Sequence, residues 1–174
     1  ATVAFTLDGT PVGSATTNAQ GVATLTGVAM PAGLNAGTYP NRVCASYAGD
    51  ANHLPTGPTC GPLVIGRSIL WVKPVDRNVG LKQPNPPTDP HLDAANCPAP
   101  SYCLELARGS TFAPGQSWSA LNLSVLRFQY ARNPPSTNAT ETVGKTYRIT
   151  AFGVTSSNYD IRYDPGTMTV VAAP

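Results

Sequence analysis

Side chains that could carry out catalysis are scarce in this chain of 174 residues. His53 and His91 are the only imidazole bases, and neither has a Gly-x-Ser-x-Gly nucleophile motif around it. Glu105 and Glu141 are the only glutamates, and the aspartates cluster at turns, where such residues serve the backbone. No glycine-rich phosphate loop lies between a strand and a helix. We therefore expect that the protein is not an enzyme.

The four cysteines form two pairs that are close in sequence. Cys44 and Cys60 flank a turn-rich stretch, and Cys97 and Cys103 flank a short proline-containing one. The sequential connectivity joins cysteines within one local loop, so we expect the disulfides Cys44–Cys60 and Cys97–Cys103. A metal site is the competing interpretation, but it needs close ligand spacing and usually histidines, which this chain does not place suitably. Disulfides form in oxidising compartments and therefore predict export, to the extracellular space or the cell surface.

Calcium is the one cofactor that the residue types allow. It needs about six to eight oxygen ligands, and without an Asp-x-Asp-x-Asp-Gly run these would come from distant loops. We expect no cofactor, with calcium as the alternative. The aspartates that could contribute lie mostly in loops: Asp8, Asp50, Asp76, Asp89, Asp93, Asp160 and Asp164.

The composition argues against nucleic acid and membrane insertion. Charged residues are 11% of the chain, the formal net charge is only +2, and lysine and arginine form no cluster. No apolar run approaches the roughly 20 residues that a bilayer span needs. The chain begins within a predicted strand, so we expect a segment of a longer polypeptide.

Short alternating apolar runs predict an all-β protein. The runs end at dipeptides such as Asp8-Gly9, where glycine supplies the positive φ that tight turns need. We expect a positive φ at Gly21 and Gly166 as well. The turn and strand pattern divides the chain into two domains, residues 1–66 and residues 67–174.

Each domain has its own expected organisation. Residues 1–66 show no helical periodicity, and the spacing of their strands suggests a β-sandwich. Residues 67–174 are expected to be mainly β, with at most one short helix within residues 114–123, starting at Gly115 or Ser117. The proline-rich residues 76–101 predict an extended loop or an edge strand. Asn133-Pro134-Pro135 and Asp164-Pro165-Gly166 predict turns. The expected strands lie near residues 2–7, 11–17, 21–29, 38–47 and 59–65, and then near residues 67–74, 102–106, 124–131, 145–152, 159–163 and 167–172.

The first domain resembles the bacterial Ig-like repeats of long surface proteins. The resemblance lies in Phe5-Thr6-Leu7-Asp8-Gly9, in Gly21-Val22-Ala23-Thr24-Leu25 and in Ala45-Ser46-Tyr47-Ala48-Gly49-Asp50-Ala51-Asn52. In that family two more strands precede the first of these segments. The resemblance therefore implies an Ig-like β-sandwich that is partial, lacking its first two strands.

The second domain resembles the MBG type of adhesin module. The resemblance is strongest in Val143-Gly144-Lys145-Thr146-Tyr147 and in Asn158-Tyr159-Asp160-Ile161, and it continues through Asp164-Pro165-Gly166-Thr167-Met168. It implies a small, mainly β, grasp-like domain that is exposed on a cell surface and stacked in tandem arrays. It implies no catalytic residues.

These observations predict a non-catalytic extracellular structural or adhesion module of a bacterial surface protein, stalk or filament. Its partners would be neighbouring modules of the same polypeptide or identical subunits, with a glycan or a host or cell-surface ligand as a further possibility. Val3, Phe5 and Leu7 form a candidate strand-pairing edge. We expect them to line a groove that a strand fills, either from a neighbouring subunit or from upstream residues of the same polypeptide.

A carbohydrate-binding accessory module is the alternative function. Trp71 and Trp118 could serve as sugar-stacking platforms, although packing is the simpler interpretation for these rings. The same packing role is expected for the strand tyrosines, namely Tyr47, Tyr147, Tyr159 and Tyr163. The two Asn-x-Ser/Thr sequons, at Asn122 and Asn138, are interpreted as chance occurrences in a bacterial chain.

Overall fold

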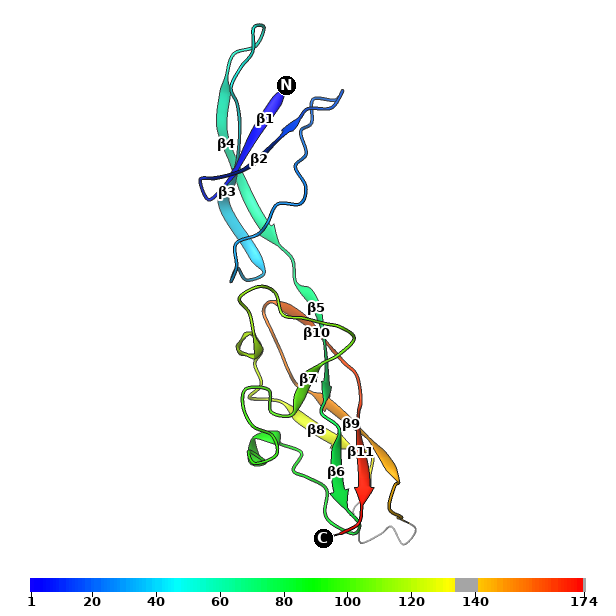
Figure 1. Ribbon diagram of the computed structural model, residues 1–174. Helices are drawn as coiled ribbons and strands as arrows, with labels where there is room; N and C mark the ends of the chain where they lie inside the picture. Colours follow the sequence, from blue (N-terminus) through cyan, green and yellow to red (C-terminus); the bar gives the residue numbers. More distant parts are fainter. Residues whose placement is uncertain (134–140, 174) are drawn as a thin grey trace. The chain divides into compact units, whose positions relative to one another are not determined.

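The computed structural model describes residues 1–133 and 141–173, and their regular secondary structure is almost entirely β-strand (Figure 1). The all-β prediction is therefore confirmed. The chain divides into two compact units, Ala1–Gly66 and Arg67–Pro174, called unit 1 and unit 2 below. No helix in the described ranges is long and apolar enough to cross a membrane.

Unit 1 is built on one antiparallel sheet with the strand order β2-β1-β3-β4. A tight turn at Asp8 and Gly9 joins the first two strands, with φ values of 50° and 78°. Positive φ at both central residues gives the turn a twist that matches the flanking strands, as the Asp-Gly dipeptide predicts. The strands are β1 (Thr2–Leu7), β2 (Thr10–Thr16), β3 (Gly37–Tyr47) and β4 (Thr56–Ile65).

The expected strand at residues 21–29 is wrong. Residues 22–31 belong to no strand, and Gly21 and Gly27 both have φ above 70°, which interrupts an extended backbone. At least one apolar residue of this segment, Leu25, packs on the sheet although its backbone does not pair with it. A Cβ at Gly13 of β2 would lie 3.3 Å from a methyl carbon of Leu25, so this side chain rests on the sheet where Gly13 leaves room. The alternating pattern thus indicated contact with one face of the sheet, and it did not indicate hydrogen-bonded pairing with a strand.

Unit 2 contains two sheets, with the strand orders β10-β5-β7 and β6-β11-β9-β8. The short helix expected within residues 114–123 is a single 3₁₀ turn, Trp118–Ala120, and Ser117 is its N-cap residue. A second 3₁₀ turn, Pro90–Leu92, begins after Asp89, whose side chain accepts from the His91 N–H. The strands are β5 (Ser68–Pro74), β6 (Arg77–Gly80), β7 (Leu104–Leu106), β8 (Arg127–Tyr130), β9 (Thr146–Phe152), β10 (Tyr159–Tyr163) and β11 (Gly166–Val171).

The first and last strands of unit 2 run side by side in parallel through both sheets. β5 pairs with β10 from Ser68↔Tyr159 onward, and β6 pairs with β11 from Arg77↔Met168 to Gly80↔Val171. The segment β5–β6 and the segment β10–β11 each bend between the strand in the first sheet and the strand in the second (Figure 1). The expected turn at Asp164-Pro165-Gly166 is this bend.

Gly166 is required at the bend for a reason other than the expected one. Its φ is not positive. A Cβ there would lie 2.5 Å from the Pro74 carbonyl oxygen, so only glycine allows the two strands to approach this closely. Beside it, the Thr167 N–H donates to Asp76 Oδ1 at 2.8 Å, which ties the two bends together.

The proline-rich region 76–101 contains both an edge strand and a loop. β6 forms its start and lies at the edge of its sheet. The prolines follow β6, and the Cys97–Cys103 disulfide closes the far end of the loop. Asn133-Pro134-Pro135 extends into residues 134–140, outside the described residues.

The two units differ sharply in how much apolar surface they bury. Unit 2 has a continuous core contributed by both sheets and by the connecting loops. In unit 1, Leu7 is the only buried hydrophobic residue, at 5% exposure. A chain of this length normally needs a larger core or covalent crosslinks to remain folded. The largest side chains fully buried in the core of unit 2 are Tyr159, Phe128, Leu70, Leu104, Leu126, Ile149 and Met168.

Candidate functional site

The two histidines serve the turns in which they lie. His53 Nδ1 is 2.8 Å from Asp50 Oδ1, and the two residues also pair through their backbones. His91 Nδ1 is 2.8 Å from Asp89 Oδ1, and its ring lies 4.3 Å from that of Tyr102. Each imidazole is held by a carboxylate of its own loop, which is an arrangement for local order.

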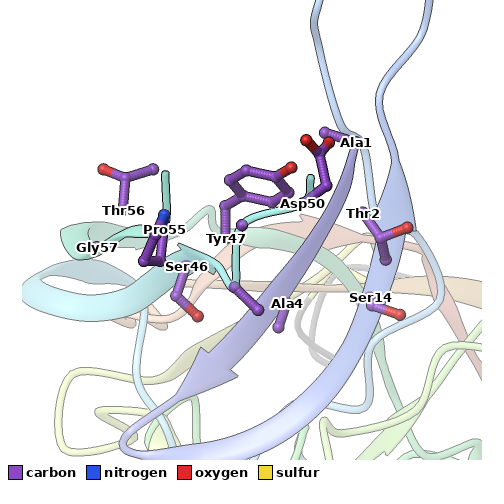
Figure 2. Close-up of a pocket in the computed structure, with 12 residues that line it drawn as sticks. Ala1, Thr2, Ala4, Ser14, Ser46, Tyr47, Asp50, Pro55, Thr56 and Gly57 are labelled. Atoms are coloured by element: carbon purple, nitrogen blue, oxygen red, sulfur yellow. The ribbon is translucent and has the colours of Figure 1, made fainter. Parts of the chain in front are cut away.

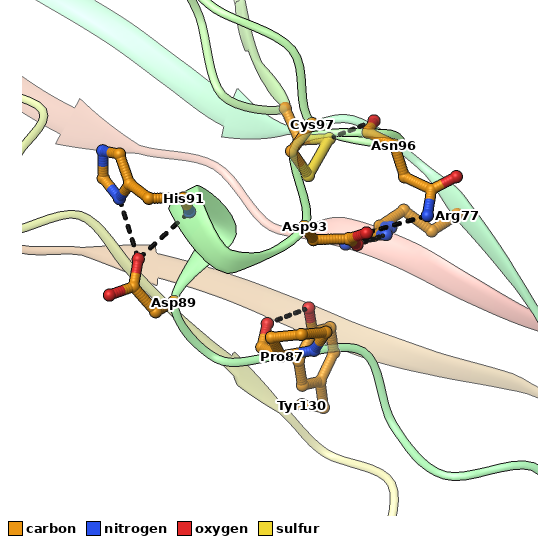
Figure 3. The surroundings of a disulfide bond; sticks show 9 residues. Arg77, Pro87, Asp89, His91, Asp93, Asn96, Cys97 and Tyr130 are labelled. Carbon is orange, nitrogen blue, oxygen red and sulfur yellow. Dashed lines mark hydrogen bonds and ion pairs between the residues drawn. A yellow bond between two sulfur atoms is a disulfide. The ribbon is translucent and has the colours of Figure 1, made fainter.

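Both expected cysteine pairs lie at bonding distance. Cys44 and Cys60 are directly opposed on β3 and β4, with their Cα atoms 4.0 Å apart. Cys97 and Cys103 close a loop of six residues in sequence separation, within the region shown in Figure 3. The first disulfide crosslinks the sheet of unit 1, and the second holds the proline-rich loop of unit 2.

Val3, Phe5 and Leu7 do not form a free edge, which corrects that prediction. Their strand, β1, lies between β2 and β3 and pairs with both, so its backbone has no open ladder. The three side chains share one face of the sheet, opposite Tyr47, Ala45 and Val43 of β3. The free edges of this sheet are β2 and β4. The backbone of β1 is therefore not available to a partner strand.

A hollow on unit 1 lies on the opposite face of β1 (Figure 2). It has a volume of about 900 Å³ and a floor of small side chains, including Ala4, Ser14 and Ser46. Tyr47 and Asp50 stand at one end. Contact of its hydroxyl with the Asp50 carboxylate, together with burial, raises the pKa of Tyr47 to about 12.

The same contact lowers the pKa of Asp50 to about 2, with further help from the Asn52 N–H and His53. The Tyr47 phenol therefore keeps its proton at neutral pH, and the Asp50 carboxyl stays ionised. A general acid or base works best with a pKa near the working pH, and these two groups lie far from it on opposite sides. This pair is therefore poorly suited to move protons.

The two tryptophans are engaged within unit 2. The Arg108 guanidinium carbon lies 3.9 Å from the centre of the Trp71 ring, and Arg108 also makes two hydrogen bonds of 2.7 and 2.6 Å to Asp164. Trp118 packs edge-on against Phe112 at 5.4 Å. One face of Trp71 is thus covered, which favours packing over a sugar platform.

The strand tyrosines of unit 2 also pack as expected. Tyr159 is 2% exposed, and its hydroxyl accepts from the Ala113 N–H at 2.9 Å. Tyr147 and Tyr163 pack partly buried against the same core. The Tyr163 hydroxyl donates to the Val154 carbonyl at 3.2 Å, while burial raises the pKa of its phenol.

The most buried polar group is one that the sequence pattern did not reveal. The side chain of Arg132 is 0% exposed and that of Glu141 is 3% exposed. Two parallel hydrogen bonds of 2.7 Å join them, and the Tyr147 hydroxyl donates to the same carboxylate at 3.1 Å. These donors, Arg132 first, hold the pKa of Glu141 at about 2, well below the ordinary 4.5. Arg132 also donates to the Gln83 carbonyl at 2.7 Å and thereby fixes the loop after β6.

The loop aspartates are paired individually and do not converge. Asp8 binds Arg42 at 2.7 Å, and Asp93 binds Arg77 through a short contact. Within the described ranges, no three His, Cys, Asp or Glu side chains gather as metal ligands would. Of the two sequons, that of Asn122 forms a local turn in which its side chain accepts from Ser124, and that of Asn138 lies outside the described residues.

Comparison with known families identifies part of unit 2. The model of the MBG domain (YGX type) matches residues 107–169, which include β8, β9, β10 and the first residues of β11. No curated protein and no solved structure matches the chain. The match supports the MBG-type module expected from the sequence. The matched range includes the buried Arg132–Glu141 pair.

Proposed function

We propose that this chain is a non-catalytic, load-bearing segment of an exported bacterial surface protein. The MBG match supports a module of surface proteins, and the resemblance to MBG adhesin modules implies tandem arrays and no catalytic residues. Two disulfides support an oxidising location. Its role would be to space and hold other parts of the polypeptide.

The parallel pairing of the terminal strands of unit 2 carries this proposal. Tension on the two ends of the unit would pull the segment β5–β6 toward its N-terminal end and the segment β10–β11 toward its C-terminal end. Because the strands are parallel and adjacent, the two pulls act in opposite directions along one ladder. All hydrogen bonds between the two strands then bear the force together. If the strands were instead pulled apart from one end, the hydrogen bonds would break one at a time.

Unit 1 contributes a covalent limit to extension. The Cys44–Cys60 disulfide joins β3 to β4, so tension can straighten only the chain outside this pair. Since unit 1 buries so little apolar surface, the crosslink also replaces part of a core. We infer that its apolar face, with Val3 and Phe5 partly exposed, is covered by β structure from a neighbouring module or an identical subunit in the assembled protein.

Single-molecule stretching tests the proposal. Pulled from its termini, the chain should unfold in two separate events, with unit 2 giving the higher force. A second attachment geometry, through Lys82→Cys and Ala172→Cys, pulls apart one end of the β6–β11 ladder. We expect severalfold lower force in this geometry. Equal forces in the two geometries, or a single unfolding event, would contradict a load-bearing role.

A further inference from the structure

The peptide bond between Asp89 and Pro90 has three groups beside it that could promote its cleavage. The Asp89 carboxylate lies in the same residue as the carbonyl carbon of this bond. The His91 ring lies against that carboxylate, with Nδ1 2.8 Å from Oδ1 (Figure 3). The carbonyl oxygen of the bond accepts from the Leu92 N–H at 3.1 Å. The bond lies outside the MBG match at residues 107–169, and the proposed mechanical role does not use it.

The Asp89 carboxylate is held in its ionised form, which is the form that can attack a carbonyl carbon. His91 also donates its main-chain N–H to Oδ1 at 3.1 Å. Two groups from other elements face the pair: the Arg127 guanidinium lies 3.2 Å from Asp89 Oδ2, and the Tyr102 ring lies 4.3 Å from the imidazole. The His91 side chain first, and Arg127 after it, lower the pKa of Asp89, so this carboxyl stays ionised in mildly acidic solution.

Proline favours cleavage at this position. Its nitrogen carries no hydrogen, so the main chain after Asp89 cannot itself cyclise onto the side-chain carboxyl. This nitrogen must leave as an amine and needs a proton, which a charged imidazole beside it can supply. Pro90 is fully buried, and the Thr88 carbonyl accepts from the Phe128 N–H at 2.7 Å. The residues on both sides of the bond are therefore fixed, which favours a reaction between neighbouring groups.

Two other places in the chain each lack one of these parts. Asp164–Pro165 is the other Asp-Pro bond, but glycine follows it, and its carboxylate is bound by Arg108 at 2.7 and 2.6 Å. Asp50 and His53 form a second carboxylate–imidazole pair at 2.8 Å, but alanine follows Asp50. In the part of the chain that the structure describes, the Asp-Pro bond and the imidazole come together at Asp89.

We propose that the Asp89–Pro90 bond cleaves itself, with the Asp89 carboxylate as nucleophile and the protonated His91 ring as proton donor. A carboxylate oxygen bonds to the Asp89 carbonyl carbon, and the Leu92 N–H stabilises the resulting oxyanion. The C–N bond then breaks, and its electron pair stays on the Pro90 nitrogen, which takes the His91 proton. A five-membered cyclic anhydride is left at Asp89.

Water completes the reaction by opening the anhydride. Asp89 then carries two carboxylates, its side chain and a new chain end, and the two protons released go to His91 and to the Pro90 amine. The net change is hydrolysis of one peptide bond. It happens once in each molecule, so it is self-processing and not catalytic turnover.

Cleavage would leave the two pieces of unit 2 associated. Neither disulfide joins them, because Cys44–Cys60 lies within residues 1–89 and Cys97–Cys103 lies within residues 90–174. The first piece keeps β5 and β6, and the second keeps their parallel partners, β10 and β11. The two pieces would then be held together by noncovalent strand pairing alone.

Mass spectrometry of the full chain tests the proposal. We expect pieces of residues 1–89 and 90–174 to form about tenfold faster at about pH 5 than at about pH 8, because imidazole takes up its proton over this range. Hydroxylamine should trap the anhydride as a hydroxamate on Asp89. After unfolding in urea, cleavage should slow to the rate of Asp164–Pro165. Equal cleavage of the two Asp-Pro bonds in the folded chain, or none at Asp89–Pro90, would overturn the proposal.

Variants separate the roles of the carboxylate and the imidazole. His91→Ala should slow cleavage by about 100-fold, as loss of a general acid predicts, whereas His53→Ala should leave the rate unchanged. Asp89→Ser keeps an oxygen that can cap the following turn but should abolish cleavage, and Asp164→Ser is its matched control. Cleavage of Asp89→Ser at the wild-type rate would show a contaminating protease and overturn the proposal. The comparison of the two Asp-Pro bonds in the wild type decides the question if a variant fails to fold.

Discussion

Arg132 and Glu141 show how much one buried contact organises in unit 2. Their pair connects the end of β8 to the residues before β9, and Arg132 also holds the loop after β6 through Gln83. Neither residue stands out by motif, and the two are nine positions apart in sequence. Only the folded chain brings them together.

Glu141→Gln should destabilise unit 2 strongly. The substitution leaves the Arg132 charge buried without its carboxylate, which is the costly way to break such a pair. We expect the thermal midpoint of unit 2 to fall by at least about 10 °C. Glu105→Gln is the control, since that carboxylate is 45% exposed in its pair with Lys73 and should shift the midpoint little. Differential scanning calorimetry measures both.

The same carboxylate predicts acid sensitivity. The pKa of Glu141 is lowered from 4.5 to about 2 in the folded state, so its ionised form stabilises the fold at any pH above about 4.5. This contribution should be lost as the pH falls from 4.5 to 2. Urea unfolding of unit 2 across that range should show a steeper loss of stability in the wild type than in Glu141→Gln. Identical pH profiles would contradict the assignment.

At the level of strands, the shared bend of β5–β6 and β10–β11 defines unit 2. The two segments come closest where Gly166 meets the Pro74 carbonyl, and the Thr167 N–H donates a hydrogen bond to Asp76 beside it. The sequence signal Asp164-Pro165-Gly166 correctly predicted a turn. It predicted the wrong reason for the glycine, because close approach of another strand leaves no local signature.

Gly166→Ala should therefore destabilise unit 2. The added methyl group would overlap a backbone oxygen that cannot move without displacing β5, and overpacking of this kind costs about 1–3 kcal/mol. Gly66→Ala is the control, because a Cβ there meets nothing within 4 Å and the φ is not positive. Chemical denaturation followed by tyrosine and tryptophan fluorescence compares the two. Equal stability of the two variants would show that the strands can separate at the bend.

For the molecule as a whole, the disulfides set how far it can extend. They span 16 and 6 residues in sequence separation, with Cα atoms only 4.0 and 4.6 Å apart. Reduction should lengthen the fully stretched chain by about 70 Å, since an extended residue spans at most about 3.6 Å. Stretching with and without reductant measures this, and Cys44→Ala with Cys60→Ala should reproduce most of the gain. An unchanged length would mean that the sulfurs are not bonded in the exported protein.

Local sequence carried most of the strand positions. β1, β3, β9 and β10 lie within a residue or so of the expected ranges, because alternation and glycine turns are local signals. The strand predicted at residues 21–29 is absent, because Leu25 packs on the sheet while the backbone of this segment pairs with no strand. The pairing of the cysteines followed from their spacing alone.

The sequence by itself determined the all-β class, the two local disulfides and the resemblance of the second part to an MBG module, because each depends on residues close together in the chain. The tertiary structure decided what depends on distant partners. It placed β1 in the middle of its sheet, set Gly166 against Pro74 and buried Arg132 with Glu141. Which strand lies beside which is a matter of long-range pairing, and no local pattern encodes it.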